Sequence, residues 1–183
     1  RSSAASDVYK RQILKAAALI IIFLIAASAA LHQTMTVWEK GRTPPAGDLV
    51  TADGHKMSIY VTGRGENTIV LLPGLGTAAP ILDFMPLAQA LARENRVVVV
   101  EPLGYGWSDT TKKARTVENT VEELRIALKA KGLDGPYVLM PHSISGIDAL
   151  YYANTYPDEV CAVIGIDCTL PAMPDYFGEG EPA

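Results

Sequence analysis

The sequence predicts an α/β fold, in which a mostly parallel sheet is flanked by helices and preceded by one transmembrane helix. Two observations carry this prediction. Short apolar runs rich in Val, Ile and Leu alternate with helical segments between residues 68 and 166, which is typical of a parallel sheet covered on both faces. A separate run at residues 13–31 is apolar almost throughout and is long enough to span a bilayer.

Composition narrows the class of protein. The chain has 183 residues, of which 49% are hydrophobic and 20% are charged, and its net charge is −4. This balance is typical of a folding globular chain.

Acidic and basic residues are interspersed, so there is no basic stripe for a phosphate backbone, and nucleic acid is excluded as a partner. Cys161 and Cys168 would lie about 23 Å apart along a strand, whereas a disulfide needs Cα atoms within about 7 Å.

The N-terminal segment is interpreted as a membrane anchor. Residues 1–12 (RSSAASDVYKRQ) lack an initiator methionine and resemble translated adaptor sequence, with an ordinary cytoplasmic tail as the alternative. Residues 13–31 would form a helix of about 28 Å, close to the ~30 Å hydrocarbon core. Lys10, Arg11 and Lys15 lie at its start, which predicts a cytoplasmic N-terminus and an extracytoplasmic globular domain.

Two alternatives to an uncleaved anchor stay open. Residues 27–29 read Ala-Ser-Ala, a cleavage site of the kind that follows a secretory signal peptide. A buried core helix would also be apolar. Residues 32–47 are interpreted as a linker, because neither Pro44 nor Pro45 can continue a helix. The globular part is expected at residues 48–183.

Within this part, hydrophobic periodicity and turn residues define the elements. Residues 49–52 and 56–62 predict a hairpin around the turn Asp53-Gly54. Buried strands are predicted at residues 68–72, 96–101, 137–140 and 161–166, and helices at residues 86–93, 116–131 and 145–156. Ligands of such sheets bind beyond the carboxyl ends of the strands. The loops after residues 72, 101, 140 and 166 are therefore the places where a site is expected.

One of these loops carries a candidate nucleophile. After residue 140 the sequence reads PHSISG, between a strand and a helix. A serine at such a sharp turn, a nucleophile elbow, has its hydroxyl exposed above the sheet and needs small residues two positions before and after it. Ser145 satisfies that need, and Pro141 does so less well. The alternative is that Ser143 is an ordinary helix N-cap.

Four segments in order, LLPGLG, EPLGYGWSD, PHSISG and YYANTYPDEVCAVIGID, resemble the first half of an α/β-hydrolase fold domain. The resemblance implies an α/β-hydrolase-type sheet that is truncated after about the sixth strand. It also implies Ser143 as nucleophile, with an oxyanion hole made by the backbone N–H groups of Leu75 and Ile144. Pro73, Pro141 and Glu101 depart from the family pattern, which leaves the subfamily and the substrate open.

The base that a serine nucleophile needs is not apparent. His32 lies at the membrane, His55 precedes a hairpin strand, and the elbow aims His142 away from Ser143. The resemblance implies a histidine and an acid beyond residue 183, with Asp167 as a less favoured candidate for the acid. The expected protein is thus a membrane-anchored serine hydrolase for a small ester or amide, without metal or cofactor. This chain is expected to be an inactive N-terminal fragment of it, and its oligomeric state is open.

Two other functions remain as alternatives. A membrane-tethered binding module could keep this fold without a complete triad. A dinucleotide-binding enzyme is the less favoured alternative, because residues 74–79 fit G-x-G-x-x-A and Glu101 ends the next strand. However, Pro80 and Pro86 interrupt the helix that would hold the pyrophosphate.

Overall fold

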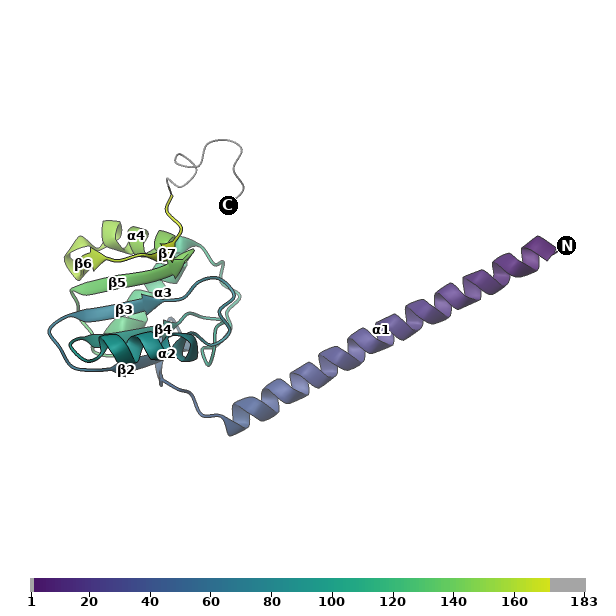
Figure 1. Ribbon diagram of the computed structural model, residues 1–183, viewed down its shortest axis with the longest axis horizontal. Coiled ribbons are helices and arrows are strands. Elements are labelled where there is room, and N and C mark those ends of the chain that lie inside the picture. The colour runs from purple at the N-terminus through teal and green to yellow at the C-terminus, as the bar shows by residue number, and fades with distance from the viewer. Residues whose placement is uncertain (1, 172–183) are drawn as a thin grey trace. The chain divides into compact units, whose positions relative to one another are not determined.

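The computed structural model describes residues 2–171, and the chain divides into two compact units between Pro44 and Pro45. The first unit is a single helix, α1 (Ser2–Arg42), and the second is a sheet with helices on its faces (Figure 1).

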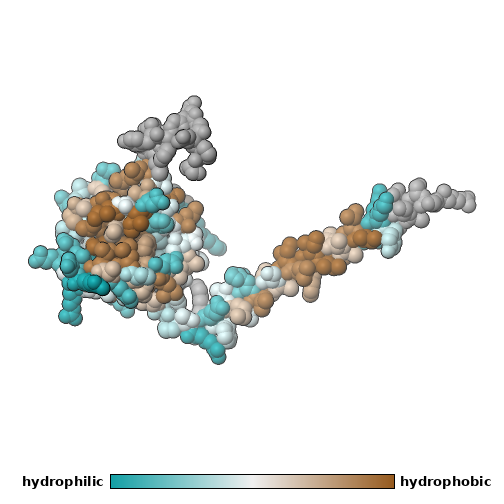
Figure 2. Space-filling view, viewed as in Figure 1, coloured by the Kyte–Doolittle hydropathy of each residue, from teal (hydrophilic) through white to brown (hydrophobic). Residues whose placement is uncertain are grey.

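Helix α1 contains the apolar run. A stretch of 31 residues, Tyr9–Glu39, has a mean hydropathy of 2.5 and is long and apolar enough to cross a membrane. Figure 2 shows this run as a continuous apolar band along the helix. A signal sequence or the core helix of a soluble protein can have the same length and hydropathy. The helix continues to Arg42, so most of the segment expected as a linker is helical, because the helix-breaking prolines come only at residues 44 and 45.

The sheet has the predicted mixed but mostly parallel character. Its strand order is β1-β2-β4-β3-β5-β6, and β7 also pairs with β5. Strand β2 runs antiparallel to both β1 and β4, whereas the pairs β3–β4, β3–β5, β5–β6 and β5–β7 are parallel. The strand bounds are β1 Asp48–Ala52, β2 His55–Thr62, β3 Thr68–Leu72, β4 Arg96–Glu101, β5 Tyr137–Ser143, β6 Val160–Val163 and β7 Ile166–Cys168.

Three helices cover the two faces of the sheet. They are α2 (Pro80–Leu91), α3 (Val117–Ala130) and α4 (Ser145–Thr155), and the short turn η1 (Pro157–Glu159) follows α4. Alternate residues of β3 point to opposite faces. Ile69 and Leu71 therefore pack with α2 in one core cluster, whereas Val70 and Leu72 join α3 and α4 in the other.

Helix α3 begins and ends as its sequence predicts. The Thr116 side chain accepts a hydrogen bond from the Asn119 N–H at 3.3 Å, which caps the first turn. Gly132 follows the helix with φ +74°, the left-handed conformation that favours glycine. Val121, Leu124 and Leu128 form the buried face.

Two element predictions were wrong in their bounds. The helix expected from Pro86 begins at Pro80, with Pro86 in its interior. The carbonyl of Leu82, left without its N–H partner by Pro86, belongs to an exposed residue, where water can satisfy it. The strand expected at residues 161–166 is split into β6 and β7 around residues 164 and 165. Cys161 and Cys168 are both free thiols, as predicted.

Candidate active site

Ser143 occupies a sharp strand-to-helix turn. It is the last residue of β5 and has φ +53°, whereas Ile144 is right-handed (φ −57°, ψ −27°) and α4 begins at Ser145. Left-handed backbone is uncommon for residues other than glycine, and it concentrates at functional sites. This is the backbone of a nucleophile elbow, which raises the serine above the carboxyl end of the sheet and next to the positive end of α4.

The loop after β3 passes directly beside this elbow. A Cβ added to Gly74 would lie 2.8 Å from Nδ1 of His142 and 3.0 Å from Cβ of Ser143. Only glycine allows so close an approach, and the next residue, Leu75, lines the same pocket as Ile144. Within the described part of the chain, no hydrogen bond is made by the backbone N–H of Leu75 or of Ile144. Two donors are therefore free at the elbow.

A pocket of about 420 Å³ opens at these two residues. Its size is that of a small-molecule site. Most of its walls are apolar, and the polar side chains are those of Tyr105, Arg115, Thr120, Ser145 and Asp148. The remaining lining residues are Pro73, Leu75, Pro102, Leu103, Val117, Ile144 and Ile147.

Tyr105 is a pocket residue that sequence reasoning missed. Its hydroxyl accepts a hydrogen bond from the Gly76 N–H at 3.4 Å, which ties the loop after β4 to the loop after β3. The Thr77 hydroxyl also donates to the Gly74 carbonyl at 3.1 Å. The motif around Tyr105 was noted only as part of a family pattern, and no local signal marked this contact.

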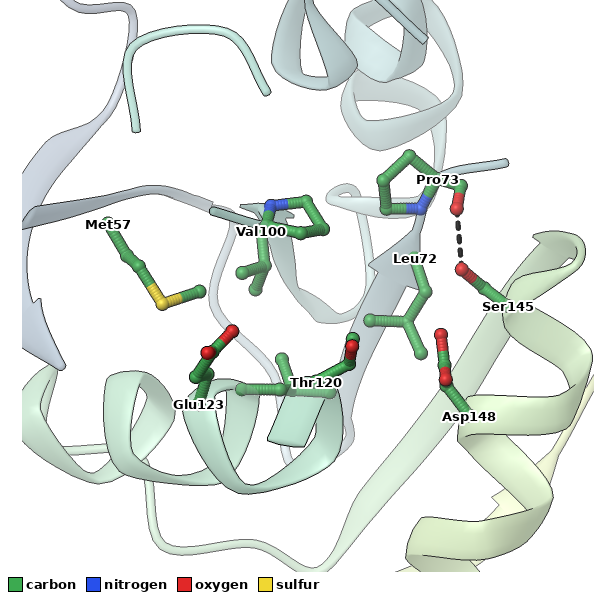
Figure 3. Close-up of a pocket in the computed structure, with 10 residues that line it drawn as sticks. Met57, Leu72, Pro73, Val100, Thr120, Glu123, Ser145 and Asp148 are labelled. Atoms are coloured by element: carbon green, nitrogen blue, oxygen red, sulfur yellow. Dashed lines mark hydrogen bonds between the residues drawn. The ribbon is translucent and has the colours of Figure 1, made fainter. Parts of the chain in front are cut away.

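A buried hydrogen bond connects the elbow to the same loop. The Ser145 hydroxyl donates to the carbonyl oxygen of Pro73, and Ser145 is only 6% exposed (Figure 3). Sequence reasoning asked only that residue 145 be small. The structure gives its hydroxyl a specific partner on the segment that leads to Leu75.

Two carboxyl groups lie below the elbow and were not predicted. Glu123 of α3 and Asp148 of α4 line a small cavity against Leu72 and Pro73 (Figure 3). Glu123 is 1% exposed, and its Oε2 accepts a hydrogen bond from Nη1 of Arg115 at 2.6 Å. Burial raises the pKa of Asp148 to about 6, and the positive charge of Arg115 opposes this rise.

Glu101, at the end of β4, serves the structure of its own loop. It is fully buried, and its carboxylate accepts hydrogen bonds from the N–H groups of Trp107 at 2.8 Å and Ile81 at 3.4 Å. A Cβ on Gly106 would collide with this carboxylate. Glu101 is therefore not available to a ribose. Because α2 begins at Pro80, no helix starts at the second glycine, Gly76, as dinucleotide binding requires.

The histidines and Asp167 do not complete a triad. The His142 ring packs against Gly74, and Nδ1 of the half-buried His55 is hydrogen-bonded to the Asp53 carbonyl at 2.9 Å. His32 lies in α1. Among the described residues, no histidine ring is hydrogen-bonded to Ser143. Asp167 is exposed with φ +44°, next to Cys168, the residue that pairs with Ser143 between β5 and β7.

Comparison with known proteins places the chain in a family. Residues 67–179 match the family described as alpha/beta hydrolase fold. The chain belongs to the α/β-hydrolase fold family. Among curated proteins, this α/β hydrolase is 38% identical over 152 residues to the uncharacterised protein YbdG of Bacillus subtilis (strain 168), covering 82% of this chain and 47% of the relative. It is 22% identical over 134 residues to a 2-hydroxy-6-oxo-6-(2'-aminophenyl)hexa-2,4-dienoic acid hydrolase of Metapseudomonas resinovorans, covering 73% and 46%.

Solved structures of α/β hydrolases share the arrangement. Cfl2 from Burkholderia cenocepacia superposes with a TM-score of 0.62 at 25% identity, over 68% of this chain and 42% of its own. The esterase EaEST from Exiguobacterium antarcticum superposes with a TM-score of 0.60 at 23% identity, over 70% of this chain and 46% of its own. The epoxide hydrolase VrEH1 from Vigna radiata superposes with a TM-score of 0.60 at 22% identity, over 69% of this chain and 40% of its own. The latter two show the fold alone, and this α/β hydrolase chain spans less than half the length of the curated relatives that it matches.

Proposed function

We propose that the full-length protein is a membrane-anchored serine hydrolase in which Ser143 attacks an ester, an amide or a related carbonyl group. The observation that carries this proposal is the left-handed backbone of Ser143 at a strand-to-helix turn, beside two N–H groups that have no hydrogen-bond partner among residues 2–171. An ordinary helix N-cap has extended backbone, and it needs neither the φ of +53° nor the close approach of Gly74.

The reaction follows from this geometry. The Ser143 oxygen adds to the carbonyl carbon of the substrate, and the carbonyl oxygen becomes an oxyanion. The N–H groups of Leu75 and Ile144 donate hydrogen bonds to that oxyanion, and the loss of one such donor typically lowers the rate by about 10²–10³. The leaving group departs, and water then hydrolyses the acyl-enzyme. A general base must take the serine proton, and we assign that base to a histidine beyond residue 183.

The substrate class is a small molecule with an acyl group. The pocket of about 420 Å³ at Leu75 and Ile144 supports a compact substrate with an apolar part. Related structures include an esterase and an epoxide hydrolase. A serine nucleophile favours acyl transfer over epoxide opening, because it forms an ester that water can cleave.

The experiment is covalent labelling of the full-length protein. A fluorophosphonate probe should modify Ser143, as identified by peptide mapping, and heat-denatured protein should stay unlabelled. Ser143→Ala should lose labelling, with a fall in turnover on the order of 10⁶. Equal labelling of the variant would exclude Ser143. Specific ligand binding without labelling would instead favour the tethered binding module, which is the alternative because no described histidine is bonded to Ser143.

We further propose that the apolar part of α1, residues 13–31, anchors the protein with its sheet unit outside the cytoplasm. The length and hydropathy of Tyr9–Glu39 support the span, and Lys10, Arg11 and Lys15 support the orientation. The full-length protein should stay with membranes in alkaline carbonate and be released by detergent. Protease added outside intact cells should digest the sheet unit. A soluble product beginning near Ala30 would show a cleaved signal peptide instead.

A further inference from the structure

We propose that Ser145 is a positioning residue that holds the two arms of the oxyanion hole at a fixed separation. It does so through the buried hydrogen bond from its hydroxyl to the Pro73 carbonyl. This inference rests on the proposed function of Ser143. It concerns a residue that does not touch the reacting atoms and that acts through the backbone on either side of it.

Two prolines lie where β3 ends beside β5. In the parallel pairing of β3 with β5, Leu72 is the partner of Pro141, and Pro73 follows directly. Proline has no N–H, so neither Pro141 nor Pro73 can donate to a ladder hydrogen bond. Neither proline can therefore supply a backbone donor where β3 ends and its loop turns toward Ser143. The Ser145 hydroxyl supplies a side-chain donor at the same place.

The hydrogen bond joins the segments that carry the two oxyanion donors. The N–H of Leu75 lies two residues after the acceptor Pro73, and the N–H of Ile144 lies immediately before Ser145. Few rotatable bonds separate the contact from either donor, so a shift at the contact moves one donor relative to the other. Oxyanion donors work only at about 2.7–3.1 Å from the developing charge. A displacement of a few tenths of an ångström therefore affects the rate.

The surroundings leave little to replace the serine. Ser145 is 6% exposed, and the cavity that it lines with Leu72 and Pro73 has only about 20 Å³ of free space and mostly apolar walls. Alanine or glycine at residue 145 would remove the donor from the Pro73 carbonyl. A water molecule in so small a space would not tie α4 to the β3 loop in the same way.

The test uses full-length enzyme and two variants, Ser145→Ala and Ser145→Gly. With p-nitrophenyl acetate we expect Ala and Gly to lower kcat about 10–100-fold with KM nearly unchanged, because the lost contact serves the transition state. A trifluoromethyl ketone, which forms a tetrahedral adduct with serine, should bind more weakly by a similar factor. Ser58→Ala is the matched control, because it deletes a buried hydroxyl that has no hydrogen-bond partner in the described structure.

The outcomes separate this inference from the proposed function. If the probe labels Ser143 in the parent enzyme, but Ser145→Ala retains the parent kcat and inhibitor affinity, the inference is overturned and the serine hydrolase stands. A fall in thermal stability with unchanged kcat, or a rise in KM alone, overturns it as well. Absence of labelling in the parent enzyme overturns both.

Discussion

Gly74 lies against Ser143, so close that a Cβ on the glycine would stand 3.0 Å from the Cβ of the serine. Gly74 belongs to the loop after β3 and Ser143 ends β5, two neighbouring parallel strands. Leu75, the residue after Gly74, lines the same pocket as Ile144, the residue after Ser143. The loop and the elbow therefore behave as one site, although 69 residues separate Gly74 from Ser143 in the sequence (143 − 74).

Gly74→Ala should damage catalysis more than folding. The new Cβ would lie 2.8 Å from Nδ1 of His142, so the loop must move and take the Leu75 N–H with it. Loss of one oxyanion donor predicts a fall in kcat of about 10²–10³. Steady-state kinetics of the full-length enzyme measure this. Leu75→Ala is the control, since it trims a side chain that is 78% exposed and leaves the N–H in place. Equal losses in the two variants would contradict the assignment.

Asp148→Asn should stabilise the protein at alkaline pH and leave its stability nearly unchanged in acid. Burial raises the pKa of Asp148 from 3.8 to about 6. The folded state therefore favours the protonated carboxyl, and stability is lost as the pH rises from 3.8 through 6. Since Asp148 is partly solvated, we expect the free energy of unfolding of the variant to be higher by only about 1–2 kcal/mol at pH ~8. Urea unfolding at pH ~4 and ~8 tests it, with the exposed Asp158→Asn as control.

Glu159→Gln should show the opposite dependence on pH. The Glu159 carboxylate accepts hydrogen bonds from Arg125 and Tyr152 and pairs with Lys129 at 2.8 Å. The Arg125 hydrogen bonds lower its pKa from 4.5 to about 2. Its stabilising effect is complete above pH 4.5 and disappears toward pH 2. The free energy of unfolding of the variant should be lower by about 1–2 kcal/mol near neutral pH. This difference should vanish in acid. A loss that persists at low pH would show packing rather than charge.

Glu101→Gln should destabilise the loop that carries Tyr105. The carboxylate accepts N–H groups from both Trp107 and Ile81, and an amide offers only one oxygen. One of the two buried N–H groups would then face the NH₂ group of the amide and lose its hydrogen bond. Such a loss typically lowers the free energy of unfolding by about 1–3 kcal/mol. Thermal unfolding of Glu101→Gln against Glu66→Gln, a change at an exposed position, measures the effect. A matching Tm in the two variants would show that the loop does not need the charge.

Most of the sheet was predictable because its signals are local. Runs such as Thr68–Leu72 and Arg96–Glu101 can only be buried strands, and Thr116 and Gly132 mark the ends of α3 by capping chemistry. Local signals failed where packing decided instead. Helix α2 tolerates Pro86 in its interior because Ile81 and Ala88 are buried against the sheet, which outweighs the lost hydrogen bond.

The candidate site was predictable only in part, for a similar reason. The PHSISG segment and its family resemblance pointed to Ser143, because the elbow is formed by consecutive residues. The contacts of Ser145 with Pro73 and of Tyr105 with Gly76 join residues that are 72 and 29 positions apart in the sequence. Hydrophobic periodicity is a local pattern and does not predict such long-range pairs. No local pattern in the sequence marks the carboxyl of Glu123 as buried. It is 1% exposed because α3 packs on the sheet, where Glu123 lines a cavity with Met57 and Val100.

The left-handed conformation of Ser143 also shapes how the protein can evolve. A non-glycine residue held there lowers stability by about 1–2 kcal/mol in every molecule, whether or not substrate is present. Glycine at residue 143 would relieve that strain and remove the proposed nucleophile in one step. Purifying selection on activity is then the force that keeps a side chain at this position. In a lineage that no longer used Ser143 as a nucleophile, a change to glycine would no longer be removed by selection. A descendant with glycine at this position would be more stable than its catalytic ancestor.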